Sequence, residues 1–140
     1  MTYFLFLDDE RAPNSSPMYN PDIPCIAVRN EDEFFHALEK YGVPSYISFD
    51  NDLGPGETEG YDIMKRLVEL DIDGVIDLTD TEFHIHSMNP IAAKNMENYI
   101  RNYMKVQHEM FINVGLGLMD NSDRKDMVSF NQLGGNVWEV

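Results

Sequence analysis

The sequence predicts an α/β domain with a mostly parallel central sheet, because short apolar runs alternate with amphipathic helical segments along its 140 residues. Four apolar runs are predicted strands, at residues 3–7, 25–28, 46–49 and 83–86. The first of them is apolar at every position, which is typical of a strand that is covered on both faces. The order of strands and helices favours right-handed crossovers between parallel neighbours.

Three segments have the periodicity of a helix with one apolar face. Residues 30–41 begin with the capping residue Asn30 and carry acids in the first turn. A second helix is predicted over 61–70, and a third opens at Pro90, where proline suits the first helical position. The first crossover, residues 9–24, contains four prolines, so we predict a loop there in place of a helix.

The length fits one domain with a short C-terminal addition. We predict that residues 1–104 form this domain and that residues 105–140 are an extension that packs on it. Within the extension, residues 110–114 are compatible with a last strand or with a continuation of the helix from Pro90. Residues 137–140 are expected to dock against the domain as an anchor.

Composition excludes several classes of protein. The formal net charge of −15 at pH 7 argues against a protein that binds nucleic acid through a basic face. The single cysteine, Cys25, excludes an internal disulfide framework and a cysteine-based zinc cluster. The sequence shows no signal peptide and no apolar stretch near the roughly 20 residues that span a bilayer. We therefore expect a cytoplasmic protein with no membrane partner.

Polar clusters follow three of the predicted strands, at the edge of a parallel sheet where ligands bind. Carboxylates that are packed together repel unless a cation neutralises them, and hard oxygen ligands favour Mg²⁺ or Mn²⁺. The alternative is that some of these acids cap helices or face solvent, and it weighs most for Glu10 and Asp52. The clusters are Asp8-Asp9-Glu10, Asp50-Asn51-Asp52 and His86-Ser87-Met88-Asn89.

Two histidines belong to the last predicted strand. His84 and His86 are two residues apart and therefore share one face of the sheet. His84 is expected to be a core or surface histidine. His86 stands at the strand end beside Ser87, which makes it a candidate general acid, phosphate ligand or metal ligand. Two-histidine phosphoesterases need two His-x-Ser/Thr motifs, and the chain does not supply them.

Two further polar residues border the acidic clusters. Arg11 is the one cation within them, and it either clamps a phosphate or pairs with Asp8 or Glu10. Asn89 precedes Pro90 and is expected first to cap a helix, whose N-terminus in turn favours anions. The spacing of the glycines after residue 52 matches neither a Walker loop nor a dinucleotide fingerprint.

The polar residues that follow the predicted strands resemble the site residues of response-regulator receiver domains. In that comparison Asp8 and Asp9 match the metal-binding acid pair, Asp50 matches the phosphoacceptor, and Ser87 matches the hydroxyl residue after the fourth strand. The chain departs from the receiver pattern in two ways. No lysine follows a predicted strand in residues 106–123, and the first crossover lacks its helix.

The fuller pattern resembles a divergent offshoot, the cyclic-phosphate-processing receiver-like domain family, over roughly residues 3–104. The resemblance implies a flavodoxin-like three-layer sandwich and an activity on cyclic phosphates, such as 2′,3′-cyclic RNA ends or cyclic nucleotides. The segments that carry it are Phe6–Arg11, Ser48–Gly54, Gly60–Asp62, His86–Pro90 and Asn95-Met96.

The leading hypothesis is a metal-dependent phosphoesterase. The cation polarises the phosphoryl group, Asp52 assists the metal or orients water, and His86 protonates the leaving oxygen. Two alternatives stay open: a signalling receiver that is phosphorylated on Asp50, and a non-catalytic nucleotide-binding or acidic inhibitor protein. The residues assigned are catalytic Asp50, His86 and Asp52, phosphate-binding Arg11, Ser87 and Asn89, and metal-binding Asp8, Asp9 and Asp50.

Overall fold

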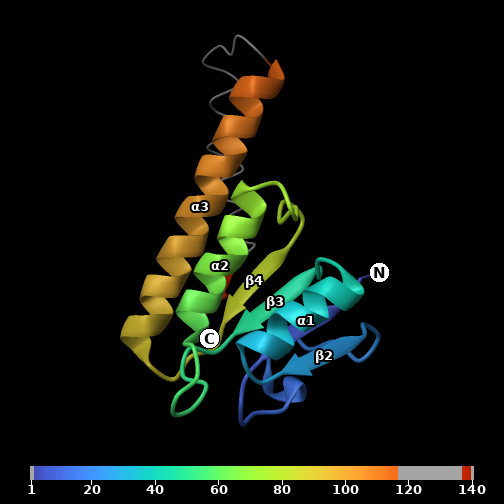
Figure 1. Cartoon of the computed structure of the whole chain (residues 1–140), viewed down its shortest axis with the longest axis vertical. Helices are drawn as coiled ribbons and strands as arrows, with labels where there is room; N and C mark the ends of the chain where they lie inside the picture. Colours follow the sequence, from blue (N-terminus) through green and yellow to red (C-terminus); the bar gives the residue numbers. More distant parts are fainter. Residues whose placement is uncertain (1, 117–136, 140) are drawn as a thin grey trace.

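A parallel sheet of five strands runs through the part of the chain that the computed structural model describes, residues 2–116 and 137–139 (Figure 1). The strand order is β2-β1-β3-β4-β5, and each neighbouring pair is parallel. This order is that of a flavodoxin-like sheet, and it confirms the predicted fold class. The strands are β1 (Phe4–Leu7), β2 (Cys25–Val28), β3 (Tyr46–Phe49), β4 (Glu82–Ile85) and β5 (Val137–Glu139).

The central strand β1 is buried on both faces, which explains its unbroken apolar run. Leu5 and Leu7 point to the helical side of the sheet and belong to the main apolar core. Phe4 and Phe6 point to the other side and are almost fully buried as well. Strands β1, β3 and β4 are in register, so that Leu7, Phe49 and Ile85 lie side by side at the carboxyl edge.

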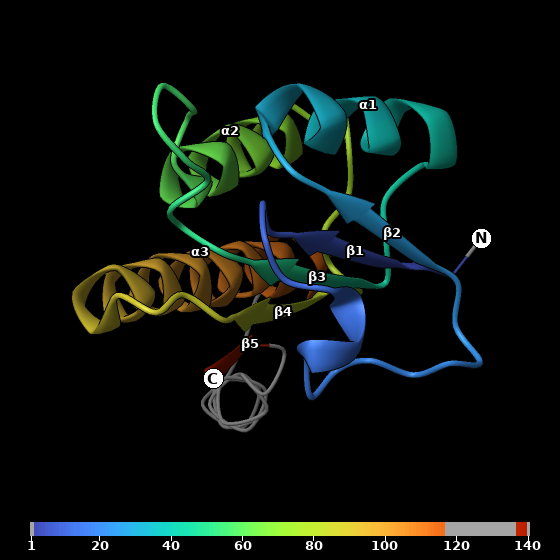
Figure 2. The same cartoon turned by 90° about the horizontal axis from the view of Figure 1, so that it is seen from below.

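Three α-helices cover one face of the sheet (Figure 2). They are α1 (Glu31–Tyr41), α2 (Gly60–Ile72) and α3 (Pro90–Leu116). Their apolar faces pack on the sheet side chains that point to the same side as Leu5, and together they form one continuous core. The core side chains that the helices contribute are Phe34, Ala37, Leu38, Ile63, Met64, Leu67, Val68, Ala93, Met96 and Ile100.

The crossover from β1 to β2 passes over the other face of the sheet (Figure 2). Residues 8–24 form a loop whose one regular element is the 3-10 turn η1 (Pro13–Ser15). Ser16, just after this turn, is buried, and its Oγ lies 3.4 Å from His84 Nδ1 of β4. Among the described residues, this proline-rich loop therefore stands where a crossover helix would form the second outer layer.

The chain beyond residue 104 continues as helix. Helix α3 runs on to Leu116, so the strand considered at 110–114 is wrong, and the boundary set after residue 104 falls inside a helix. Strand β5 pairs with β4, which brings part of the C-terminal extension into the sheet. Residues 117–136 lie outside the described part of the chain. No helix of the described residues is long and apolar enough to cross a membrane.

Replacing Asn30 with alanine is expected to lower the free energy of unfolding by about 1 kcal/mol. Asn30 Oδ1 accepts a hydrogen bond from the backbone N–H of Glu33 at 2.9 Å, which caps α1 as its sequence predicts. Urea denaturation measures the loss, and Asn30→Asp, which keeps the acceptor, should retain most of the stability. Equal stability of the wild type and Asn30→Ala would contradict this role.

Candidate metal and phosphate site

The site begins with three residues that stand in a row at the carboxyl edge of the sheet. Asp8, Asp50 and His86 are the first residues after β1, β3 and β4. Their backbone N–H groups continue the ladder by donating to the last carbonyl of the neighbouring strand, at 2.9 to 3.0 Å. Because the three strands are adjacent and in register, the side chains of this row are brought together at one place on the edge.

These three side chains form a compact group of possible metal ligands. One carboxylate oxygen each from Asp8 and Asp50 and one ring nitrogen of His86 lie within 4.8 Å of one another. All three residues are buried. Asp9, which the sequence also predicted as a ligand, lies in the wall of the adjoining pocket and is not a member of this compact group.

The Asp8 carboxylate is held in place from three directions. Its Oδ1 accepts hydrogen bonds from the backbone N–H groups of Glu10 and Arg11, at 2.8 and 2.9 Å. Its Oδ2 accepts from His86 Nε2 at 2.9 Å. Burial alone would raise the pKa of Asp8, but the two backbone N–H groups and His86 outweigh it and lower the pKa. Asp8 is therefore an ionised, fixed carboxylate.

Asp50 has the opposite electrostatic character. Burial, and then the negative charge of Asp8, raise the pKa of Asp50 from 3.8 to about 6. One hydrogen bond to its Oδ1, from the backbone N–H of Asn51 at 2.8 Å, opposes this shift. Two buried carboxylates that repel each other in this way are a costly arrangement without a neutralising group.

His86 lies beneath Asp8 and is absent from the pocket wall, so the role of direct proton donor to a leaving oxygen does not suit it. Its Nε2 is engaged by Asp8 and its Nδ1 by Ser48 Oγ, at 2.9 and 2.6 Å. The ring also stacks on Phe6, with centroids 4.8 Å apart. Burial lowers the pKa of His86 although Asp8 opposes the shift, so the ring is neutral at pH 7.

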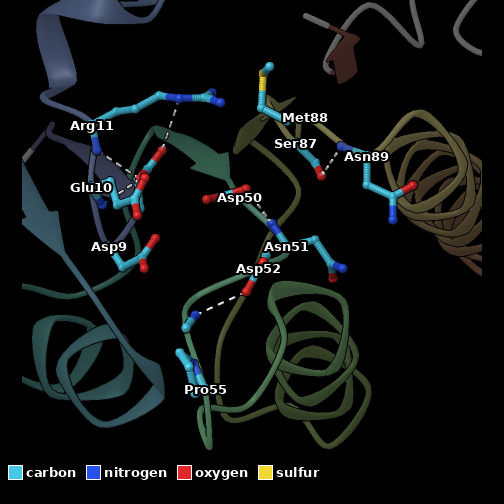
Figure 3. Close-up of a pocket in the computed structure, with 12 residues that line it drawn as sticks. Asp9, Glu10, Arg11, Asp50, Asn51, Asp52, Pro55, Ser87, Met88 and Asn89 are labelled. Carbon is cyan, nitrogen blue, oxygen red and sulfur yellow. Dashed lines mark hydrogen bonds and ion pairs between the residues drawn. The ribbon is translucent and has the colours of Figure 1, made fainter.

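The row opens into a pocket of about 770 Å³ (Figure 3). Its wall carries five carboxylates and one cation, Arg11, so the pocket is strongly negative. Asp52 Oδ1 accepts from the backbone N–H of Gly54 at 3.1 Å and thus holds the loop after β3. The lining residues are Asp8, Asp9, Glu10, Arg11, Asp50, Asn51, Asp52, Gly54, Pro55, Ser87, Met88 and Asn89.

The three residues predicted to bind phosphate all border this pocket. Arg11 extends along one rim, donating from Nη1 to the backbone carbonyl of His86 at 2.9 Å, with its Nε 3.9 Å from Asp8 (Figure 3). Asn89 caps α3 as predicted, because its Oδ1 accepts from two N–H groups of the first turn. Ser87 Oγ accepts from the N–H of Asn89 at 3.1 Å.

Two residues that position the site were not predicted from the sequence. Asn51 caps α2 from ten residues away, because its Oδ1 accepts from the N–H of Tyr61 at 3.0 Å. Ser48 is fully buried in β3 and contacts His86. The spacing of Ser48 and His86 relative to their strand ends places both on one face of the sheet, which was the available signal for Ser48.

The donor set fits a hard divalent cation. Asp8 and Asp50 supply buried carboxylate oxygens, and Asp9 adds another carboxylate in the adjoining wall. Oxygen-rich sites of this kind suit Mg²⁺ or Mn²⁺. A cation between the carboxylates would remove the repulsion that raises the pKa of Asp50.

The sheet order and the row of acids at its carboxyl edge define a receiver-like α/β protein. Residues 3–102 match the family model of the cyclic-phosphate processing receiver domain, and the chain belongs to this family. A comparison with curated proteins gives no match. A solved fusion that carries a trimeric coiled-coil segment of yeast Spc42 is similar at 13% identity and a TM-score of 0.49, over 96% of this chain and 95% of that one. A likeness at this level carries no argument.

Proposed function

We propose that this protein is a divalent-cation-dependent phosphoesterase that opens cyclic phosphates. The observation that carries the proposal is the pairing of Asp8 and Asp50, two buried carboxylates held side by side by the sheet ladder at the floor of an open pocket. Natural proteins keep such a repulsive pair where function requires it. The family to which the chain belongs supplies the substrate class.

In this proposal Asp8, Asp9 and Asp50 hold Mg²⁺ or Mn²⁺. The cation would polarise a phosphoryl oxygen and lower the pKa of a bound water. The protein contributes the fixed geometry: Asp8 is immobilised by its hydrogen bonds, and Asp50 is placed by the backbone ladder. Pre-formed ligand positions reduce the ordering cost of binding the cation.

The phosphate is held by donors around the rim. Arg11 uses one guanidinium N–H group on the carbonyl of His86, which leaves further N–H groups for phosphate oxygens. Ser87 donates through its hydroxyl, and Asn89 donates through its amide NH₂ because its carbonyl oxygen is engaged in capping α3. Asp52, on the loop after β3, orients the attacking water.

The reaction we propose is hydrolysis of one ring ester. A water oxygen adds to phosphorus, the bond from phosphorus to one ring oxygen breaks, and that oxygen takes a proton. Since both ring nitrogens of His86 are occupied by Asp8 and Ser48, the proton comes from water in the open pocket. His86 supports the reaction through Asp8.

We propose as substrate a small cyclic nucleotide or an RNA end that carries a 2′,3′-cyclic phosphate. A pocket of about 770 Å³ can take one nucleotide. A net charge of −15 disfavours long contacts with a nucleic-acid backbone, so that recognition would be confined to the end. A cytoplasmic setting suits the single cysteine and belongs to the same proposal.

Incubation with cyclic-phosphate substrates tests the function. The protein is mixed with a 2′,3′-cyclic-phosphate oligoribonucleotide, or with 2′,3′- or 3′,5′-cyclic nucleotides, in Mg²⁺, in Mn²⁺ or in chelator. We expect cation-dependent addition of one water to one of them, measured by mass spectrometry. The product should be absent with Asp50→Asn and unchanged with Asp22→Asn, which makes the same exchange at an exposed loop residue.

Other outcomes would favour the alternatives. Asp50 stands where a receiver carries its phosphoacceptor, although no lysine lines the pocket among the described residues. A stable adduct of one phosphoryl group after incubation with acetyl phosphate and Mg²⁺ would favour the receiver. Binding of a cyclic nucleotide without turnover, by a folded and cation-loaded protein, would favour the non-catalytic protein.

A further inference from the structure

A buried serine connects two histidines on the sheet face opposite the helices. Ser48 Oγ lies 2.6 Å from His86 Nδ1 and 3.0 Å from His84 Nδ1. Ser48 and His84 are fully buried, and His86 is nearly so. With the contact from His86 Nε2 to Asp8, these residues form a continuous chain of hydrogen bonds from the metal and phosphate site into the sheet.

The serine hydroxyl has one proton and can donate to only one of its two imidazole neighbours. The other Nδ1 must therefore carry a proton and donate to Ser48 Oγ. If both Nδ1 atoms were bare, one buried contact would lack a hydrogen bond. If both were protonated, both could donate to Ser48 Oγ, but neither ring would then accept the buried hydroxyl proton. The geometry thus requires that His84 and His86 differ in the protonation of Nδ1.

Asp8 and the unpartnered nitrogen of His84 decide which histidine carries the Nδ1 proton. The carboxylate is an acceptor only, so His86 Nε2, at 2.9 Å, must be protonated. His84 Nε2 is buried without a partner, so the proton of His84 belongs on Nδ1, which donates to Ser48, and Ser48 donates to a bare His86 Nδ1. We infer that Ser48 and His84 are positioning residues that impose opposite tautomers on two histidines, so that His86 serves Asp8 as an Nε2–H donor and is not itself a ligand of the cation.

The second ring nitrogen of His84, Nε2, supports this direction of the hydrogen bonds. His84 Nε2 is buried and has no hydrogen-bond partner. Under the inferred tautomer this nitrogen is an unprotonated acceptor. If the hydrogen bonds ran in the opposite direction, His84 Nε2 would be an unpaired N–H donor, and folded proteins leave buried donors unpaired less often than buried acceptors. Ser16 Oγ, 3.4 Å from the same Nδ1, is a longer second contact.

Only one part of the inference rests on the proposed function, namely the expected effect of Ser48 and His84 on the affinity for a divalent cation. Asp8 Oδ1 accepts two backbone N–H groups, and Oδ2 accepts the His86 proton while keeping a lone pair for a cation. If His86 bound the cation directly, its Nε2 would have to be bare and its Nδ1 protonated. His86 Nδ1 would then donate to Ser48, Ser48 would donate to His84 Nδ1, and His84 would have the Nε2–H tautomer. The tautomer of His84 therefore indicates whether His86 binds the cation.

The first test is a long-range ¹H–¹⁵N correlation spectrum of the imidazole nitrogens, recorded on the full chain at pH 7 in chelator. We expect His86 with a protonated Nε2 and His84 with a protonated Nδ1. The exposed His36 provides an internal reference for an unconstrained ring. Protonated Nε2 on His84 together with protonated Nδ1 on His86 would overturn the inference.

The second test uses variants and the affinity for Mn²⁺. In Ser48→Ala, His86 Nδ1 loses the donor that holds the ring and its ¹⁵N resonance should shift, while the Kd for Mn²⁺ rises about tenfold or more. Ser48→Thr keeps the hydroxyl and should restore both properties. Thr81→Val removes an equally buried hydroxyl, which donates to the carbonyl of Pro44 at the other end of β4, and should change neither property.

The outcomes separate the inference from the proposed function. Neither the tautomers nor the affinity for Mn²⁺ depends on a substrate. A wild type that fails to bind Mn²⁺ would contradict the proposed function and leave the tautomers to be judged by the spectrum. An unchanged Kd in a folded Ser48→Ala whose His86 Nδ1 resonance has shifted would overturn the positioning role.

Discussion

Replacing Asp50 with asparagine is expected to stabilise the metal-free protein by about 1 to 3 kcal/mol above pH 6. Burial and the charge of Asp8 raise the pKa of Asp50 from 3.8 to about 6, so the ionised side chain is unfavourable in the folded state. Asparagine removes the charge, and its carbonyl oxygen can still accept the N–H of Asn51. Thermal or urea unfolding in chelator measures the gain.

The gain should depend on pH in a defined direction. Below about pH 3, Asp50 is protonated in the folded state and largely so in the unfolded state, and the two proteins should be similar in stability. Between about pH 3 and 6 the unfolded carboxyl ionises before the folded one, so the wild type loses stability relative to the variant. Above about pH 6 the difference should be constant. Asp22→Asn should show no such profile.

The same substitution should remove the affinity for a divalent cation and with it the turnover. An amide lacks the charge that a hard cation requires, and the remaining carboxylate of Asp8 shares its oxygens with three N–H donors. We expect the Kd for Mn²⁺ to rise at least tenfold. A variant that is less stable than the wild type at pH 7, or that binds Mn²⁺ equally well, would contradict the assignment of Asp50.

The opposite directions of these two effects explain why the acids stand where they do. A folded protein without a function for them would gain stability by losing one carboxylate of the pair. The backbone ladder nevertheless places Asp8 and Asp50 side by side, and the loop after β1 adds two N–H groups that keep Asp8 ionised. The sheet therefore imposes the repulsion, and a bound cation would relieve it.

The strands and the acids of the site could be predicted from the sequence because their signals are local. Apolar runs marked β1, β2, β3 and β4, and each residue of the row at the carboxyl edge directly follows such a run. Asn30 and Asn89 cap helices that begin within a few residues, so their role was also visible. Parallel topology then brings separate strand ends together without further information.

The parts that could not be predicted depend on contacts between distant segments. In the sequence, Ser48 is a single polar residue in a predicted buried strand. Its role becomes visible only in the structure, where the register of β3 and β4 places it between two histidines. That register also turns His86 from a candidate proton donor into a partner of Asp8. Helix α3 runs to Leu116 because nothing in residues 105–114 breaks a helix, although the apolar run there is equally compatible with a strand.

Replacing Gly60 with alanine is expected to lower the free energy of unfolding by about 3 kcal/mol or more. Gly60 is the first residue of α2 and packs directly against the end of β3. A Cβ at this position would lie 1.7 Å from the carbonyl oxygen of Asp50, which is part of the backbone and cannot rotate away. The substitution must therefore separate α2 from the sheet, at the cost of the hydrogen bond from Gly60 N–H to the carbonyl of Asn51, 2.8 Å long.

Gly56→Ala is the matched control, because it makes the same exchange in the loop that precedes α2, without a clash. Gly56 has a positive φ of 78°, and nothing lies within 4 Å of its Cβ position, so the control should lose only about 1 kcal/mol. In Gly60→Ala the displaced strand end also moves Asp50, and the Kd for Mn²⁺ should rise along with the loss of stability. Equal losses in the two variants, measured by urea denaturation, would show that close contact between α2 and β3 does not hold the site together.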